Sequence, residues 1–410
     1  MKKIKLLCLS LLALALVASA CGDDDDTTSG AGTTEAPSGT TGGGSGGEGE
    51  DCSLSEPVKI VALVEKPPEG PNALPFYDEG LQMALEDLGD ELCGQPIEFE
   101  RIPASPTDGS AALNAYLQAL DEDPHFVMGL PSSTAVLAVA PEVAKAGIPM
   151  IYWSVAPQAF ANAEAGSEWG FMIRPRNTGI AQLQVDYAMD ELGAKRIALL
   201  CANIAFGAQG CDAAAAAIQE KGGEVVARES NETTDTDLTA KVLALRNSNP
   251  DAVLAFTFPN NLVVLYNQAA DNGLNVPIFG GSSAGLIIGA VDSDARGNVW
   301  GTDDCVPAND PETADWKARY EQKFGKSMIG SGYNIAESYD SIMLAAEAIK
   351  RAGSLDPGDI AAALRELEYD GSCTTYVSDA GQGLHHSTDI VRFDAEGVGE
   401  SVLKVEVPGD

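Results

Sequence analysis

Basic residues are scarce in this chain. It has 25 Lys and Arg against 61 Asp and Glu, which gives a net charge of −36. A surface of this charge repels the phosphates of nucleic acids and the headgroups of anionic lipids. We therefore expect no nucleic-acid partner, and the excess of acids predicts a solvated, soluble surface without identifying a ligand.

The sequence is also poor in residues that bind metals or phosphates. Its three histidines, His125, His385 and His386, lie far in sequence from the cysteines, and no Cys-x-x-Cys motif occurs. Closely spaced Cys and His ligands are typical of structural zinc sites. The glycine-rich segment near the N-terminus is not followed by the Gly-Lys-Ser/Thr of a phosphate-binding loop. We expect neither a metal nor a cofactor.

Long hydrophobic runs are missing except at the N-terminus. Three lysines among the first five residues precede an apolar run from Leu6 to Val17, and small residues 18–20 precede Cys21. The run is shorter than the roughly 20 apolar residues that span a bilayer. The order is that of a secretory signal peptide over residues 1–20. It resembles the bacterial lipoprotein signal, which implies acylation of Cys21. The alternative is a plain secretory signal cut near Ala20.

The segment 21–56 has the composition of a linker. Residues 27–50 are almost wholly Thr, Ser, Gly, Ala, Pro and Glu, with too little apolar surface to fold. A Gly/Ser-rich chain of this length spans roughly 30 Å. We expect a globular body outside the cytoplasmic membrane, on its outer face or in the periplasm, held to the membrane only through the lipid anchor.

Cysteine usage agrees with export. Cys8 lies in the signal and Cys21 takes the lipid, so six of the eight cysteines remain. An even number in an oxidising compartment indicates three disulfides, whose connectivity the sequence leaves open. We expect the sequential pairs Cys52–Cys93, Cys201–Cys211 and Cys305–Cys373.

The body alternates short apolar runs with segments of helical periodicity. The run Val58–Val64 precedes a predicted helix over Gly80–Leu88, and the alternation continues to a strand at Val276–Phe279. Such a pattern predicts α/β architecture with doubly wound parallel sheets. The series is too long for one sheet, so we expect two Rossmann-like lobes with a break near 174–176.

Five sequence stretches carry a family resemblance. They are FVMGLPSST at 126–134, GIPMIYWSVA at 147–156, IALL at 197–200 with AFG at 205–207, NPDAVL at 249–254, and YNIAESYDSI at 333–342. Their order resembles the type I periplasmic binding fold of the branched-chain amino-acid-binding (Leu/Ile/Val-binding) family of ABC importers. The resemblance implies two lobes joined by crossing hinge strands. Lobe 1 would hold 57–174 and 307–385, and lobe 2 would hold 175–306 and 386–410.

The resemblance also implies a function without catalysis. The protein would be a monomeric solute-binding protein that closes on a small molecule in the interlobe cleft and delivers it to ABC permease subunits. The ligand would be an amino acid, an amide or a small carboxylate. A sensory module that reports ligand to a membrane receptor is the alternative, because sensing needs the same closing cleft.

Ligands of open α/β sheets bind beyond the carboxyl ends of the strands. The loop Ser132, Ser133 and Thr134 follows such a strand and opens a helix. Hydroxyls and free N–H groups at a helix N-terminus suit a carboxylate, although Ser133 or Thr134 could simply cap the helix. The loop Ser154, Val155 and Ala156 resembles the family's second ligand loop, or forms an ordinary turn.

Aromatic residues are the candidates for the opposite wall. Phe206 stands where relatives often place an aromatic ring over the ligand, and Phe258 follows the strand that ends at Phe256. Tyr77 and Trp153 are further candidates near the cleft. Each of these rings could instead serve packing alone.

The loop that begins at Phe279 departs from the family pattern. Amino-acid binders of this family place a glutamate there to pair with the ligand's ammonium, and Ser283 stands near that position. A buried ammonium without a charged partner is costly. Either another acid, such as Glu65, takes this role, or the ligand is not an α-amino acid.

The same loop also matches the nucleophile-elbow pattern G-x-S-x-G, at 281–285. Asp340 or Asp379, followed by His385 or His386, would supply the remaining members of a triad around Ser283. A serine hydrolase is therefore a further alternative to solute binding.

Overall fold

The computed structural model describes residues 52–65, 77–155, 168–303, 311–325, 332–372, 374–379, 383–385 and 387–406. The expected signal peptide, Cys21, Ala156 and the expected pair Cys305–Cys373 fall outside these ranges. None of the described helices is long and apolar enough to cross a membrane.

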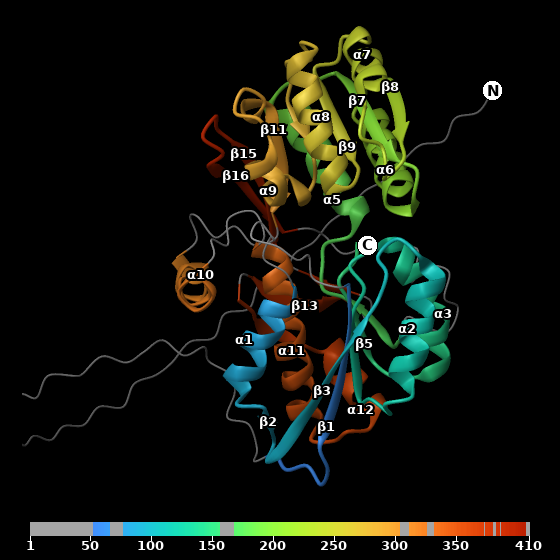
Figure 1. The fold of residues 1–410 in the computed structure, drawn as a ribbon, viewed down its shortest axis with the longest axis vertical. Helices are drawn as coiled ribbons and strands as arrows, with labels where there is room; N and C mark the ends of the chain where they lie inside the picture. Colours follow the sequence, from blue (N-terminus) through green and yellow to red (C-terminus); the bar gives the residue numbers. More distant parts are fainter. Residues whose placement is uncertain are drawn as a thin grey trace, which may run out of the picture. The chain divides into compact units, whose positions relative to one another are not determined.

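The first of two sheets has strand order β12-β13-β14-β6-β5-β4-β1-β3-β2 (Figure 1). Its central strands run parallel, and β1 is buried almost throughout, which explains its continuous apolar sequence. The strands are β1 (Val58–Val64), β2 (Glu91–Leu92), β3 (Gln95–Pro103), β4 (Phe126–Gly129), β5 (Met150–Tyr152), β6 (Gly170–Met172), β12 (Glu368–Asp370), β13 (Thr375–Asp379) and β14 (Gly383–His385).

Helices pack on both faces of this sheet. Along β1, Ile60 belongs to the core formed with α1 and α11, whereas its neighbour Val61 belongs to the core formed with α2 and α3. Alternate residues of a strand point to opposite faces, so one strand serves both cores. The helices are α1 (Tyr77–Leu88), α2 (Gly109–Leu120), α3 (Ser133–Ala146), α10 (Pro311–Phe324), α11 (Gly332–Ala352) and α12 (Pro357–Arg365). This sheet and its helices are called the first lobe below.

The second sheet has strand order β16-β15-β11-β10-β9-β7-β8 and forms the second lobe with its helices (Figure 1). Two core clusters again lie on its two faces. Its strands are β7 (Arg196–Ala202), β8 (Glu224–Asn231), β9 (Ala252–Phe256), β10 (Ile278–Phe279), β11 (Val299–Asp303), β15 (Ser387–Phe393) and β16 (Gly399–Glu406). Its helical segments are α5 (Asn177–Asp186), the π-helix η1 (Tyr187–Glu191), α6 (Ala205–Glu220), α7 (Thr239–Asn247), α8 (Pro259–Asp271), α9 (Ser283–Ile287), η2 (Ile288–Ala290) and η3 (Arg296–Asn298).

The chain passes between the two sheets three times. It leaves the first sheet after β6, returns after β11, and crosses again between β14, which pairs with β6, and β15, which pairs with β11. The α/β fold with two mostly parallel sheets, predicted from the alternating sequence pattern, is confirmed. One predicted helix, Thr178–Leu192, differs in detail. It changes to a π-helix at Tyr187, whose ring packs against Phe279 and Trp300.

Two of the three expected disulfides are present, Cys52–Cys93 and Cys201–Cys211. The first closes a loop with a sequence separation of 41 residues and ties the start of the described body to the β2–β3 turn.

Removing the Cys52–Cys93 bond should lower the free energy of unfolding by about 4 kcal/mol, because the crosslink restricts the unfolded chain. Urea unfolding of Cys52→Ala, Cys93→Ala and the double variant measures the loss. The three losses should be nearly equal, since each variant lacks the same bond. If the loss in the double variant equals the sum of the two single losses, the stabilisation comes from the two side chains separately and not from the crosslink.

Candidate functional site

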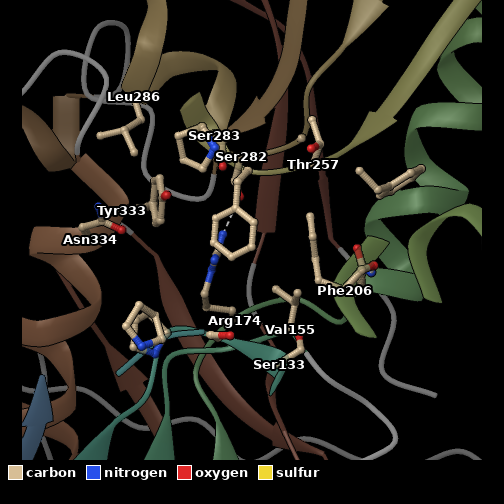
Figure 2. A pocket seen from close by; sticks show the side chains of 18 of the residues that line it. Ser133, Val155, Arg174, Phe206, Thr257, Ser282, Ser283, Leu286, Tyr333 and Asn334 are labelled. Atoms are coloured by element: carbon tan, nitrogen blue, oxygen red, sulfur yellow. Dashed lines mark hydrogen bonds between the residues drawn. The ribbon is translucent and has the colours of Figure 1, made fainter. Parts of the chain in front are cut away.

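A cavity of about 470 Å³ lies where the carboxyl ends of strands from both sheets meet. Its walls come from the residues that follow β1, β4, β5 and β6 in the first lobe, and β7, β9 and β10 in the second. The start of α11 completes the wall. Figure 2 shows Ser133 and Val155 on one side, with Thr257, Ser282 and Ser283 on the other. This is the position at which open α/β sheets bind ligands.

Most residues predicted for the site line this cavity. They are Tyr77, Ser132, Ser133, Val155, Phe206, Phe258 and Ser283, together with Glu65, which was considered as a substitute acid. Their role as ligand contacts stays a prediction. Thr134 and Ser154 are not part of the lining. The backbone of Thr134 faces Gly109 at the start of α2, and Ser154 lies behind Ser133, with 3.2 Å between their Oγ atoms.

The N-terminus of α3 forms the polar floor of the cavity. Ser132 is the residue that precedes the helix, but its side chain makes no capping hydrogen bond. The N-cap position thus falls on Ser132, whereas the alternative had placed the capping residue at Ser133 or Thr134. Because the first N–H groups of a helix have no partner within the helix, they and the buried Ser133 hydroxyl can donate to an anion.

Of the two further aromatic candidates, Tyr77 lies at the cavity surface and Trp153 lies behind it. Tyr77 lines the cavity, and burial raises the pKa of its hydroxyl well above the usual value, so the hydroxyl keeps its proton. Trp153 is fully buried beneath it, with ring centroids 4.6 Å apart. The Trp153 Nε1 donates to the Ser341 hydroxyl at 2.8 Å. Trp153 therefore supports the wall that Tyr77 presents.

A charged cluster that sequence analysis missed lies beside the cavity (Figure 2). Arg174 follows β6, and its Nε is 2.6 Å from Oε1 of Glu337, with side chains only 9% and 5% exposed. Its guanidinium stacks over the Tyr333 ring at 4.6 Å and donates from Nη2 to the Ser282 hydroxyl at 2.5 Å. Arg174 thus joins the first lobe to the loop before α9 in the second.

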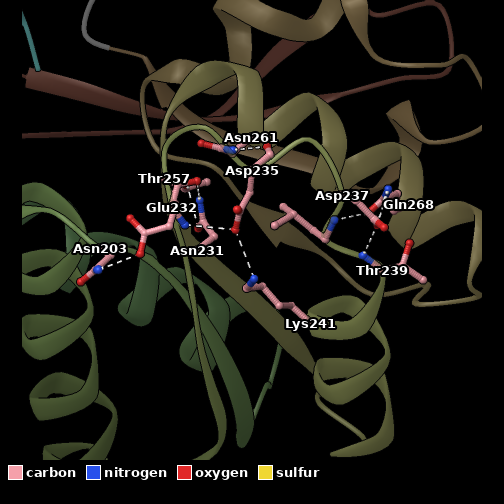
Figure 3. A network of polar contacts seen from close by, with 11 residues as sticks. Asn203, Asn231, Glu232, Asp235, Asp237, Thr239, Lys241, Thr257, Asn261 and Gln268 are labelled. Carbon is pink, nitrogen blue, oxygen red and sulfur yellow. Dashed lines mark hydrogen bonds and ion pairs between the residues drawn. The ribbon is translucent and has the colours of Figure 1, made fainter.

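A hydrogen-bond network in the second lobe holds Thr257 at the cavity wall (Figure 3). The Thr257 hydroxyl donates to Asn231 Oδ1 at 3.1 Å, so its lone pairs are left for a donor in the cavity. Nearby, Asn261 donates to the Asp235 carbonyl at 2.7 Å and Lys241 pairs with the Asp235 carboxylate at 3.1 Å. The Glu232 N–H, followed by Lys241, lowers the pKa of Asp235 and keeps it ionised.

The aromatic part of the second-lobe wall is also fixed from behind. Asn177 Nδ2 donates to the Phe206 carbonyl at 2.9 Å, and the Phe206 ring meets Phe256 edge-on at 6.4 Å. Phe258 precedes Pro259, the first residue of α8, where proline is well tolerated. These contacts set Phe206 and Phe258 at the carboxyl ends of β7 and β9.

The hydrolase alternative is not supported by the residues that the structure describes. Asp340 accepts hydrogen bonds from the Ser372 N–H and the Tyr376 hydroxyl, both at 2.8 Å, and does not line the cavity. The side chains of Asp379 and His385, and all of His386, lie outside the described part. The described residues also hold no group of three or more His, Cys, Asp or Glu arranged for a metal.

The sequence model of the periplasmic binding protein family matches residues 57–397 of the chain. The chain belongs to this family. Periplasmic binding proteins of this kind bind solutes outside the cytoplasm and serve ABC transporters, and the match covers both lobes around the cavity.

Solved structures share the fold of this periplasmic binding protein. A leucine-binding protein LivK from Thermotoga maritima superposes with a TM-score of 0.76 at 22% identity, covering 85% of this chain and 98% of its own. LivJ of Streptococcus pneumoniae, in complex with isoleucine, superposes with a TM-score of 0.74 at 20% identity, covering 85% of this chain and 99% of its own. A Rhodopseudomonas palustris solute-binding protein in complex with 4-hydroxybenzoate superposes with a TM-score of 0.76 at 18% identity, covering 86% of this chain and 98% of its own.

Proposed function

We propose that this protein is an extracytoplasmic solute-binding lipoprotein of an ABC importer, which binds a small amino-acid-like solute between its lobes. The observation that carries the proposal is the cavity of about 470 Å³, whose walls come from both sheets. Its floor offers hydroxyls and helix N–H groups, and its opposite wall offers Phe206 and Phe258. A polar end and an apolar body of a small solute would both find matching surfaces.

Binding would proceed by hinge closure. The solute first docks on Ser132 and Ser133 of the first lobe, and the second lobe then closes Phe206, Phe258 and the Ser283 loop over it. A ligand shifts an open–closed equilibrium only if it binds the closed state better, which here means contacts with both lobes. The closed form would dock on permease subunits, with no chemistry performed on the solute.

The N-terminal segment supports a location outside the cytoplasm, at the membrane. Acylation at Cys21 would anchor a monomer to the membrane, and the linker 21–56 would keep it near the permease. The disulfides Cys52–Cys93 and Cys201–Cys211 suit an oxidising compartment outside the cytoplasm.

A thermal-shift screen with amino acids, amides and small carboxylates, followed by calorimetry on the hits, tests the proposal. Ser133→Ala should weaken binding of a hit about tenfold or more, because a hydrogen-bond donor to the ligand is lost. Thr134→Ala is the matched control, since this hydroxyl is one position further along α3 and outside the lining. Equal affinity of Ser133→Ala and wild type would contradict the docking site.

A further inference from the structure

Glu65 is an acid of the cavity whose carboxylate has no partner among the residues that the structure describes. It follows β1 directly and is partly buried. Its backbone carbonyl accepts a hydrogen bond from Arg101 at 2.7 Å, which fixes the main chain at this point. Within the described residues, however, no ion pair or hydrogen bond reaches its carboxylate, and Arg101 pairs with Asp78 instead. Burial raises the pKa of Glu65, as expected for a desolvated acid without a counter-ion.

The other charge of the described lining is already balanced. Arg174 lines the cavity, but its guanidinium forms a close ion pair with Glu337. This pair contributes no net charge to the site. Glu65 is therefore the uncompensated charge in the described part of the lining.

Amino-acid binders of the resembled family hold the ligand's ammonium at the loop that follows β10, but here this loop carries no charge of its own. Residues 280–283 contain no acid, and the Ser282 hydroxyl accepts from the Arg174 guanidinium at 2.5 Å. A cation of the ligand at this loop would therefore find no acidic partner among these residues. The negative charge that could receive it lies instead in the first lobe, at Glu65.

Two aromatic residues share the first-lobe part of the lining with Glu65. Tyr77 and Tyr333 line the same cavity, and Glu65, Tyr333 and Arg174 all act on the Tyr77 hydroxyl electrostatically. Aromatic rings and a carboxylate in the wall of one cavity together favour an ammonium group, because the ring faces also attract cations.

We propose that Glu65 is the counter-ion for a cationic nitrogen of the ligand, and that the solute is a zwitterion whose two charged groups are both bound by the first lobe. Its ammonium binds at Glu65, and its carboxylate binds at Ser132, Ser133 and the N-terminus of α3. The second lobe then covers the apolar part of the solute. This inference rests on the proposed function and names the solute class for the same cavity.

Calorimetry with matched ligand pairs tests the assignment on the purified full-length protein. Each pair is an amino acid and its deaminated acid, for example leucine with 4-methylpentanoate and phenylalanine with 3-phenylpropanoate. Wild type should bind the amino acid of a pair about 100-fold more tightly, and Glu65→Gln should remove this preference. Glu142→Gln, the same substitution on α3 next to Lys145, should leave it unchanged.

The control for folding is thermal unfolding without ligand, in which Glu65→Gln should be at least as stable as wild type, because a desolvated charge is removed. Tight binding of acids or amides alone would overturn the role of Glu65 and leave the solute-binding function standing. Equal amino-acid affinity in wild type and Glu65→Gln would also overturn it. If no compound of the panel binds measurably, both the zwitterion assignment and the proposed amino-acid-like solute are contradicted.

Discussion

Replacing Arg174 with methionine should lower the free energy of unfolding by about 3–5 kcal/mol, because the buried Glu337 carboxylate would lose the guanidinium that balances its charge. The two side chains are 9% and 5% exposed, and their closest atoms are 2.6 Å apart. Water therefore cannot replace the lost guanidinium. Methionine keeps much of the apolar stem of arginine, so the loss reports mainly on the charge.

A double-mutant cycle separates the pair from its surroundings. Arg174→Met, Glu337→Gln and the double variant are compared by urea unfolding. The double variant should be more stable than Arg174→Met alone, since it no longer buries a carboxylate without the Arg174 guanidinium. Ser282→Ala removes only a hydrogen-bond acceptor of Arg174 and should cost about 2 kcal/mol or less. Strictly additive losses for Arg174 and Glu337 would show that the two groups do not interact.

Asp340 should make the protein less stable as the pH rises. It is fully buried in α11, and burial raises its pKa from 3.8 to about 7, although hydrogen bonds from Ser372 and Tyr376 oppose the shift. The folded state therefore holds this proton more tightly than the unfolded chain does. Its stabilising contribution is complete below the unfolded pKa and is lost as the pH rises through the folded pKa. Three pKa units correspond to about 4 kcal/mol between about pH 4 and pH 8.

Urea unfolding at a series of pH values measures this dependence in wild type and in Asp340→Asn. Asparagine has nearly the same shape and can still exchange hydrogen bonds with Ser372 and Tyr376, but it does not titrate. From about pH 4 to pH 8 the unfolding free energy of wild type should fall steadily relative to that of Asp340→Asn. Two parallel curves over this range would mean that Asp340 is not protonated in the folded state.

Local pattern in the sequence was enough to predict the α/β fold and several of the loops that line the cavity. Apolar runs such as β1 and β4 are diagnostic of buried parallel strands, and the residues after such strands meet at one edge of the sheet. This is why Ser133, Val155, Phe206 and Phe258 lie around one cavity although they come from four different loops.

Contacts between distant segments were not predictable in this way. Arg174 and Glu337 are brought together only when α11 packs beside the end of β6, and nothing in either local sequence indicates the other. Thr134 was predicted with Ser133, but successive helix residues point about 100° apart, so only one of the two reaches the cavity. Strands β12 to β14 were also not predicted, because short antiparallel segments carry little periodicity.

The most direct test of solute binding between the lobes uses the best hit of the screen and a variant whose cavity is filled. Ser283→Trp places a large ring in the lining, on a partly exposed position at the start of α9. Isothermal titration calorimetry should show one ligand bound per wild-type chain and no measurable binding to the variant, while the unfolding free energies of the two remain similar. Wild-type affinity in the filled variant would place the ligand outside this cavity and contradict the account.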